Sequence, residues 1–164
     1  MKKQIIFKGL RRPLQLVPAC FKNGRRGTTF RITKNIEFTK SCHYKLYSDD
    51  QYGWNRLFGV HKGIFGVYKN SGCFAWRNNN GMIDIAMLTY INGKRDVDII
   101  KIVPRNKSLQ YTILREGPYL QYYIGGQLLG ESWIGPNRKW LWGCGLRFKC
   151  RAPQTIIVEQ KNLD

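Results

Sequence analysis

The chain has 164 residues, of which 43% are hydrophobic and 13% aromatic, a composition that excludes an intrinsically disordered protein and fits one folded domain. Its 28 Lys and Arg against ten Asp and Glu give a formal net charge of +18 at pH 7. Such an excess predicts an anionic partner: nucleic acid, an acidic polysaccharide, a membrane surface or an acidic face of another protein.

Positive charge is concentrated in the N-terminal segment. Residues 1–40 contain eleven Lys and Arg against one acid, Glu37, for a net +10, whereas the remaining 124 residues contain 17 against nine, for a net +8. Residues 9–28 are interrupted by Pro and Gly, so residues 1–28 are interpreted as a basic arm or edge segment. The partner-binding residues expected there are Lys2, Lys3, Lys8, Arg11, Arg12, Lys22, Arg25 and Arg26.

No targeting or membrane segment is expected. Lys8, Arg11 and Arg12 interrupt the first apolar run, whereas a signal peptide needs about 7–15 apolar residues in succession. No apolar run approaches the length of about 20 residues that a transmembrane helix requires. The sequence therefore predicts neither a signal peptide nor insertion into a membrane.

Residues 29–164 show the patterns of an all-β domain. Residues 28–38 alternate as a half-buried strand does, and Lys34 alone breaks the alternation. Residues 81–91 are apolar on both faces, which predicts a central strand covered on each side. Further strands are predicted at 3–8, 43–47, 56–60, 63–68, 71–77, 96–103, 109–115, 119–124, 127–129, 139–148 and 155–161.

Three dipeptides mark tight hairpins between these strands: Asn80-Gly81, Asn92-Gly93 and Gly125-Gly126. Asn-Gly favours the type I′ turn, because both central residues of that turn need a positive φ. Many short strands joined by such turns predict an antiparallel two-sheet β-sandwich of the jelly-roll or concanavalin-like type over residues 29–164.

The cysteines and histidines predict neither a metal site nor a disulfide framework. The five cysteines contain no C-x-x-C pair, and His43 and His61 are the only histidines. Cys144 and Cys150 could flank one hairpin and pair, but free thiols agree better with the odd count. No cofactor is expected.

No catalytic residue is predicted, and an enzyme is not the favoured interpretation. The sequence has no nucleophile elbow, phosphate loop, dinucleotide fingerprint or H-E-x-x-H motif. The ten carboxylates are scattered; strands could bring Asp84 and Glu131 together as a glycosidase pair, but no pattern selects them.

Aromatic and cationic residues alternate in the second half of the chain, and such a mixture can stack on sugars and hold an anion. The alternative is that the aromatics fill the core, which is the interpretation favoured for Trp140 and Trp142. The glycan-binding residues expected are Asn70, Arg77, Tyr90, Tyr122 and Trp133.

Four stretches, SCHYKL, DDQYGWNRLFGV, KNSGCFAWR and IDIAMLTYINGKR, carry a resemblance that covers about three quarters of the chain. With them the chain resembles small β-sandwich proteins of bacteriophages and of gut and marine bacteria, which have a concanavalin-like or polysaccharide-lyase-like shape. It departs from relatives that carry a His pair before Asn70 and a His near the end, since it has Tyr68-Lys69 and Ala152-Pro153-Gln154. It also lacks the Gln-x-His motif of jelly-roll alginate lyases, and these departures argue against an enzyme.

Together these features favour a non-enzymatic structural protein of a bacteriophage virion, folded in the host cytoplasm and part of an oligomeric assembly. The basic arm would dock on acidic neighbouring virion proteins, and it could also contact nucleic acid. The alternative is a lectin-like module that binds an acidic polysaccharide. A polysaccharide lyase is a third interpretation, in which Tyr90 would act as base and Arg77 would neutralise a uronate.

Overall fold

The computed structural model describes residues 2–6, 8, 25–26, 29–42, 53–62, 68–135, 140–147 and 156–162. The first of its two sheets contains, in spatial order, β1 (Lys2–Ile6), β12 (Ile156–Asn162), β3 (Thr29–Phe38), β8 (Leu109–Glu116), β9 (Tyr119–Ile124) and β10 (Gln127–Trp133). The second contains β2 (Arg25–Arg26), β11 (Trp140–Cys144), β4 (Asn55–Lys62), β5 (Asn70–Asn79), β6 (Met82–Ile91) and β7 (Lys94–Pro104). A short 3₁₀ helix, η2 (Lys40–Cys42), follows β3.

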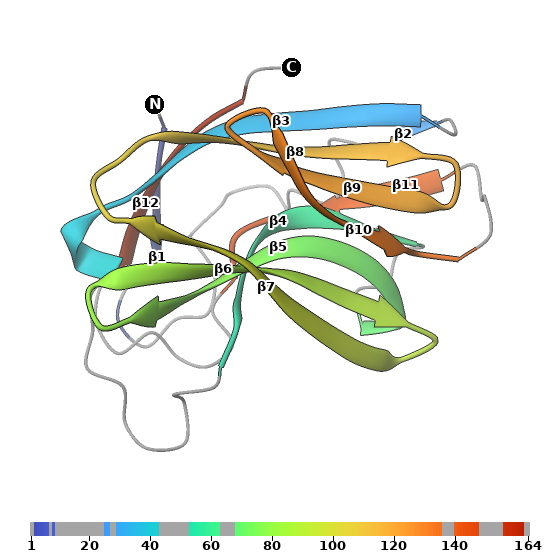
Figure 1. The fold of residues 1–164 in the computed structure, drawn as a ribbon, viewed down its shortest axis with the longest axis horizontal. Coiled ribbons are helices and arrows are strands. Elements are labelled where there is room, and N and C mark those ends of the chain that lie inside the picture. The colour runs from blue at the N-terminus through green and yellow to red at the C-terminus, as the bar shows by residue number, and fades with distance from the viewer. Residues whose placement is uncertain are drawn as a thin grey trace.

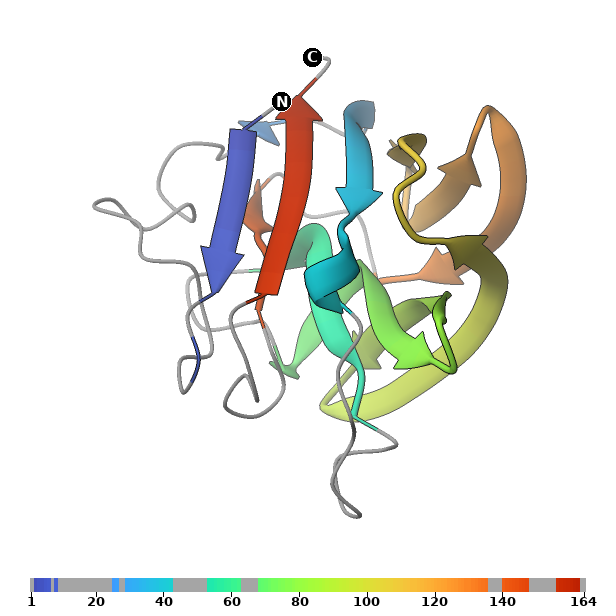
Figure 2. The same cartoon turned by 90° about the vertical axis from the view of Figure 1, so that its left-hand side faces the viewer.

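Within the described ranges each sheet has six strands, and all neighbouring strands are antiparallel. Figure 1 shows the sheets as two layers, with β3, β8 and β9 in one and β5, β6 and β7 in the other. Figure 2 shows β12 returning to lie between β1 and β3, so that the two chain ends lie near each other. The predicted all-β sandwich is therefore confirmed.

The described parts of the N-terminal segment are edge strands. β1 pairs with β12, with Lys2 opposite Gln160, and β2 pairs with β11, with Arg26 opposite Trp140. Arg11, Arg12 and Lys22 lie outside the described residues. The structure thus places both described strands at sheet edges, and binding of a partner by this segment stays a prediction.

The three predicted hairpin turns have the backbone that the dipeptides require. Both central residues have positive φ in each turn: 43° and 93° at Asn80-Gly81, 50° and 84° at Asn92-Gly93, and 61° and 81° at Gly125-Gly126. These values fit the type I′ turn, whose twist matches that of the paired strands. The turns fix the register of β5 on β6, of β6 on β7 and of β9 on β10.

Replacing Gly93 by Val is expected to lower the free energy of unfolding by about 1–3 kcal/mol, because a β-branched residue resists a positive φ. Among the described residues, no atom lies within 4 Å of the position that a Cβ would take at Gly93, so the loss comes from the backbone. Gly93→Asn is the control, since Asn tolerates this conformation. Equal denaturation midpoints for wild type and Gly93→Val would show that this account of the turn is wrong.

The core lies between the two sheets and is rich in aromatic rings. The ring of Phe74 meets Tyr111 and Tyr122 edge-on, with centroids 5.4 and 5.2 Å apart, and Phe38 packs against Trp76 at 5.2 Å. β6 is buried on both faces over Ile83–Thr89, as residues 81–91 predicted. A second, smaller apolar cluster therefore lies on the outer face of the second sheet.

Lys34, which breaks the alternation of β3, lies on the inward face of that strand. Its ammonium is 5.1 Å from the centroid of the Phe58 ring, a cation–π contact that accommodates the charge at the margin of the core. The predicted strands at 43–47 and most of 63–68 lie outside the described residues. Among the residues that are described, no helix has the length and hydropathy needed to cross a bilayer.

Candidate functional site

The candidate site lies on the face of the second sheet that points away from the first. Side chains alternate between the two faces of each strand, so pairing places every second residue in rows across the outer face. One row joins Ser71, Tyr90 and Arg95, and the row before it joins Cys73 and Leu88. Polar, aromatic and apolar residues of β4 to β7 thus meet on one surface.

A pocket of ≈ 200 Å³ opens on this face. None of its described lining residues is acidic, whereas three are arginines and three are aromatic. This composition is suited to a ligand that has both a negative charge and a flat or ring-shaped surface. The lining residues are Trp54, Arg56, Tyr68, Leu88, Tyr90, Arg95 and Arg147.

Backbone pairing holds two of these arginines together. The amide of Arg56 donates to the carbonyl of Arg147 at 2.8 Å, and the amide of Arg147 donates to the carbonyl of Arg56 at 2.9 Å. Their guanidinium groups lie 5.5 and 5.7 Å from the centroid of the Tyr68 ring. Because Arg56 is buried, its desolvated positive charge favours an anion in the pocket.

Two tyrosines, Tyr68 and Tyr90, line the pocket together with these arginines. Tyr68 and Tyr90 meet edge-on, with ring centroids 5.5 Å apart. Arg95 lies directly across from Tyr90 in the β6–β7 hairpin. Within the described part of the chain, neither tyrosine hydroxyl nor the Arg95 guanidinium has a hydrogen-bond partner, so all three polar groups are available to a ligand.

Leu88, which lines the pocket, belongs to an apolar cluster in which two thiols also lie. Leu88 of β6 lies opposite Cys73 of β5, whose Sγ donates to the Leu88 carbonyl at 3.6 Å, and Cys144 packs against the same cluster. The neighbouring Cys73 thiol and the charge of Arg56 lower the pKa of the Cys144 thiol. The neighbouring Cys144 thiol, and then burial, raise the pKa of the Cys73 thiol. Cys42, Cys73 and Cys144 are free thiols, and the absence of disulfides and metals over the whole chain stays a prediction.

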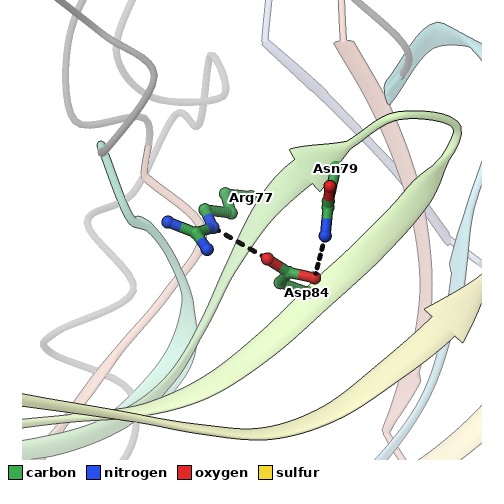
Figure 3. Close-up of polar contacts among 3 residues, drawn as sticks. All are labelled: Arg77, Asn79 and Asp84. Atoms are coloured by element: carbon green, nitrogen blue, oxygen red, sulfur yellow. Dashed lines mark hydrogen bonds and ion pairs between the residues drawn. The ribbon is translucent and has the colours of Figure 1, made fainter.

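Beside the pocket, an arginine is held by a buried carboxylate (Figure 3). Arg77 Nε donates to Asp84 Oδ2 at 2.8 Å, and Asn79 Nδ2 donates to Asp84 Oδ1 at the same distance. The Arg77 guanidinium also lies 4.5 Å from the centroid of the Trp54 ring, which lines the pocket. Arg77 therefore adjoins the pocket but does not line it.

The structure separates the predicted glycan-binding residues. Tyr90 lines the pocket, while Arg77 lies on the same face six residues away, in the row of Asp84. Asn70 supports the β6–β7 hairpin, since its Oδ1 accepts the amide of Asn92 at 3.2 Å. Trp133 lies on β10 of the first sheet, 40% exposed.

The prediction for Tyr122 is wrong. Its side chain is fully buried against Phe74, and its hydroxyl lies 3.2 Å from the hydroxyl of Ser132. Leu120 and Ile124, two positions away on either side, face the core as well. A ligand on the surface therefore has no access to this ring.

Most of the pocket was missed by reasoning from the sequence. The position of Arg95 could have been predicted, because a two-residue turn at Asn92-Gly93 places it opposite Tyr90. Arg56 and Arg147 meet only through a bridge between distant segments, and no local pattern indicates that bridge. Trp54 and Tyr68 flank strands rather than belonging to them, so strand periodicity gives no signal for them.

Several solved structures share this fold. Alginate lyase AlyC3, solved with dimannuronate, has a TM-score of 0.64 at 12% identity, over 99% of this chain and 74% of its own. A Saccharomyces cerevisiae protein described as functionally unknown has a TM-score of 0.59 at 10% identity, over 98% of this chain and 85% of its own. An alginate lyase of Pseudomonas aeruginosa has a TM-score of 0.55 at 12% identity, over 84% of this chain and 64% of its own.

The present chain thus spans less than two thirds of the Pseudomonas enzyme. No protein-family model and no curated protein matches the sequence. At 10–12% identity the likeness establishes a fold, a β-sandwich of the kind found in polysaccharide lyases, and leaves activity open. The comparisons give no support to a bacteriophage virion protein.

Proposed function

We propose that the chain binds an acidic polysaccharide in the pocket on the outer face of the second sheet. The observation that carries the proposal is the pocket lining, in which Arg56, Arg95 and Arg147 accompany three aromatic side chains and no described acid. Aromatic rings stack on the apolar faces of sugars, and guanidinium groups pair with carboxylate or sulfate. The proposal replaces the virion interpretation, which depended on the charge of residues 1–28 and on a resemblance.

The shared fold supports polysaccharide over the other polyanions that the charge allows. One similar structure is an alginate lyase in complex with dimannuronate, an acidic sugar. A nucleic acid is normally held along a broad basic surface that follows the phosphates. The pocket here is instead small and lined by rings, which agrees better with one or two sugar units than with a phosphate backbone.

Alginate and alginate whose carboxylates have been reduced to alcohols form a direct test. The protein is expected to bind the acidic polymer and to lose at least about tenfold in affinity for the reduced one, because the charged hydrogen bonds disappear. Arg95→Gln should weaken binding of the acidic polymer by a similar factor. Lys101→Gln removes the same charge from the same strand but opposite Ile85, a core residue, and serves as the matched control.

Calorimetric titration of the three proteins distinguishes the outcomes. Equal affinity for acidic and reduced polymer would contradict the proposal. Equal losses in Arg95→Gln and Lys101→Gln would mean that binding depends on net charge and not on the pocket.

A polysaccharide lyase is the second candidate, and the position of Tyr90 favours it. This tyrosine lines the pocket together with three arginines. In β-elimination a base removes the proton beside the carboxylate, cations stabilise the resulting charge, and the glycosidic oxygen leaves with a proton. Tyr90 and Arg95 could fill these roles, whereas Arg77, the partner expected from the sequence, lies outside the pocket. Formation of unsaturated product by wild type but not by Tyr90→Phe would support the lyase.

A further inference from the structure

We infer that Arg77 forms a second anion-binding subsite on the outer face, so that the protein recognises an acidic polysaccharide at two points along its chain. This inference rests on the proposed function of the neighbouring pocket. Arg77 is 23% exposed and does not line the pocket, so it would contact a different sugar unit.

Arg77 is held in place from two sides. Asp84 accepts its Nε–H at 2.8 Å, and the Trp54 ring lies 4.5 Å beneath the guanidinium. Asp84 is only 1% exposed, and Asn79 occupies its second oxygen at 2.8 Å. A carboxylate fixed in this way orients the arginine, so little side-chain entropy remains to be lost when a ligand binds.

The ion pair leaves the terminal nitrogens of Arg77 for a ligand. Arginine can pair with a carboxylate through two parallel N–H bonds. From Arg77, however, Asp84 accepts only the Nε–H. In Figure 3 the hydrogen bond to Asp84 starts at Nε alone, and one terminal nitrogen points away from the carboxylate. Among the described residues, Arg77 has no further hydrogen-bond partner.

The two sites differ in electrostatics. Asp84 offsets the charge of Arg77, so this subsite offers directed N–H donors and adds little long-range attraction. The three arginines of the pocket supply the attraction. An anionic group that reached Arg77 would therefore be one held nearby by a ligand already bound in the pocket.

The rows of the sheet set how far Arg77 lies from the Tyr90 end of the pocket. Arg77 pairs with Asp84, and Tyr90 pairs with Ser71, six residues further along the same two strands. At about 3.3 Å per residue these rows are roughly 20 Å apart. Trp54 belongs to both sites, since it lines the pocket and stacks on Arg77. A polymer that carries an acid on successive units matches this arrangement, and a single acidic sugar does not.

The test compares mannuronate monomer, dimer and hexamer as ligands of the whole chain. A longer oligomer binds more tightly simply because it offers more units to the pocket. Beyond this statistical gain, wild type is expected to bind the hexamer about tenfold more tightly, because one more charged contact forms. The variant Arg77→Gln/Asp84→Asn removes both charges of the ion pair, so that no charge is left buried alone. It should lose this excess and keep the affinity of wild type for the monomer.

Arg95→Gln is the comparison variant, and it should weaken binding of monomer and hexamer alike. If wild type shows no excess for the hexamer, or if the double variant keeps it, the subsite is refuted and the proposed function stands. If wild type binds neither monomer nor hexamer, the proposed function itself fails. Thermal unfolding of the double variant shows whether it is folded. If it is not, the affinities of wild type for monomer, dimer and hexamer decide whether a second subsite exists.

Discussion

Replacing Gly59 by Ala is expected to lower the free energy of unfolding by about 3 kcal/mol, the upper end of the usual cost of overpacking. Gly59 lies on β4 between Cys73 of β5 and Cys144 of β11. A Cβ at this position would overlap the Cβ of Cys73 and the carbonyl oxygen of Gly72. Because one of these atoms belongs to the backbone, the strands would have to separate, and Arg56 on the same strand would move with them.

Gly130→Ala is a matched control for this substitution. There the new methyl group would meet Met87, with Sδ at 2.5 Å and Cε at 2.7 Å, which are the far end of a flexible side chain. The expected loss is about 1 kcal/mol or less. Chemical denaturation of both variants measures the difference, and similar midpoints would contradict the claim that β4 and β5 approach each other too closely for any side chain at Gly59.

Replacing Arg56 by Met is expected to weaken binding of an acidic polysaccharide by about 10–100-fold while the melting temperature stays level or rises. Arg56 is 8% exposed, so its stem is packed and Met preserves most of that packing. Its charge lies close to that of Arg147 and Arg95 in a pocket without a described acid. Removing it avoids the desolvation cost of a buried charge in the empty protein and removes a ligand contact in the complex.

Arg115→Met serves as the opposite case. Arg115 is also buried, but it lies on β8 of the first sheet, where its Nε donates to the Gly117 carbonyl at 2.9 Å. The variant should lose stability, because that carbonyl loses its donor, and should keep wild-type affinity. If Arg56→Met binds as tightly as wild type, Arg56 does not contribute to the binding site.

The fold was predictable because its signals are local. The Asn-Gly dipeptides fix two hairpins through the φ of their own residues, and the apolar run of β6 shows on its own that both faces are covered. The burial of Tyr122 could also have been predicted, because Leu120, Tyr122 and Ile124 lie two residues apart and so share the face that packs into the core.

The site was less predictable because its residues meet across strands that are distant in the sequence. Arg56 and Arg147 are neighbours only through their bridge, and Arg77 is set apart from Tyr90 by the register of β5 on β6. The excess of positive charge in residues 1–40 predicted that a basic arm binds the partner. Net charge, however, gives no information on where cations gather in space.

The most direct test of the account is to map where an acidic oligosaccharide binds. Two-dimensional NMR of the labelled protein, titrated with a mannuronate oligomer, is expected to shift the amide signals of Leu88, Tyr90 and Arg95, which lie at the pocket on β6 and β7. Signals from Gln121 and Tyr123 on the first sheet should stay in place. Shifts confined to residues 1–28, with none at the pocket, would contradict the account and return binding to the basic N-terminal segment.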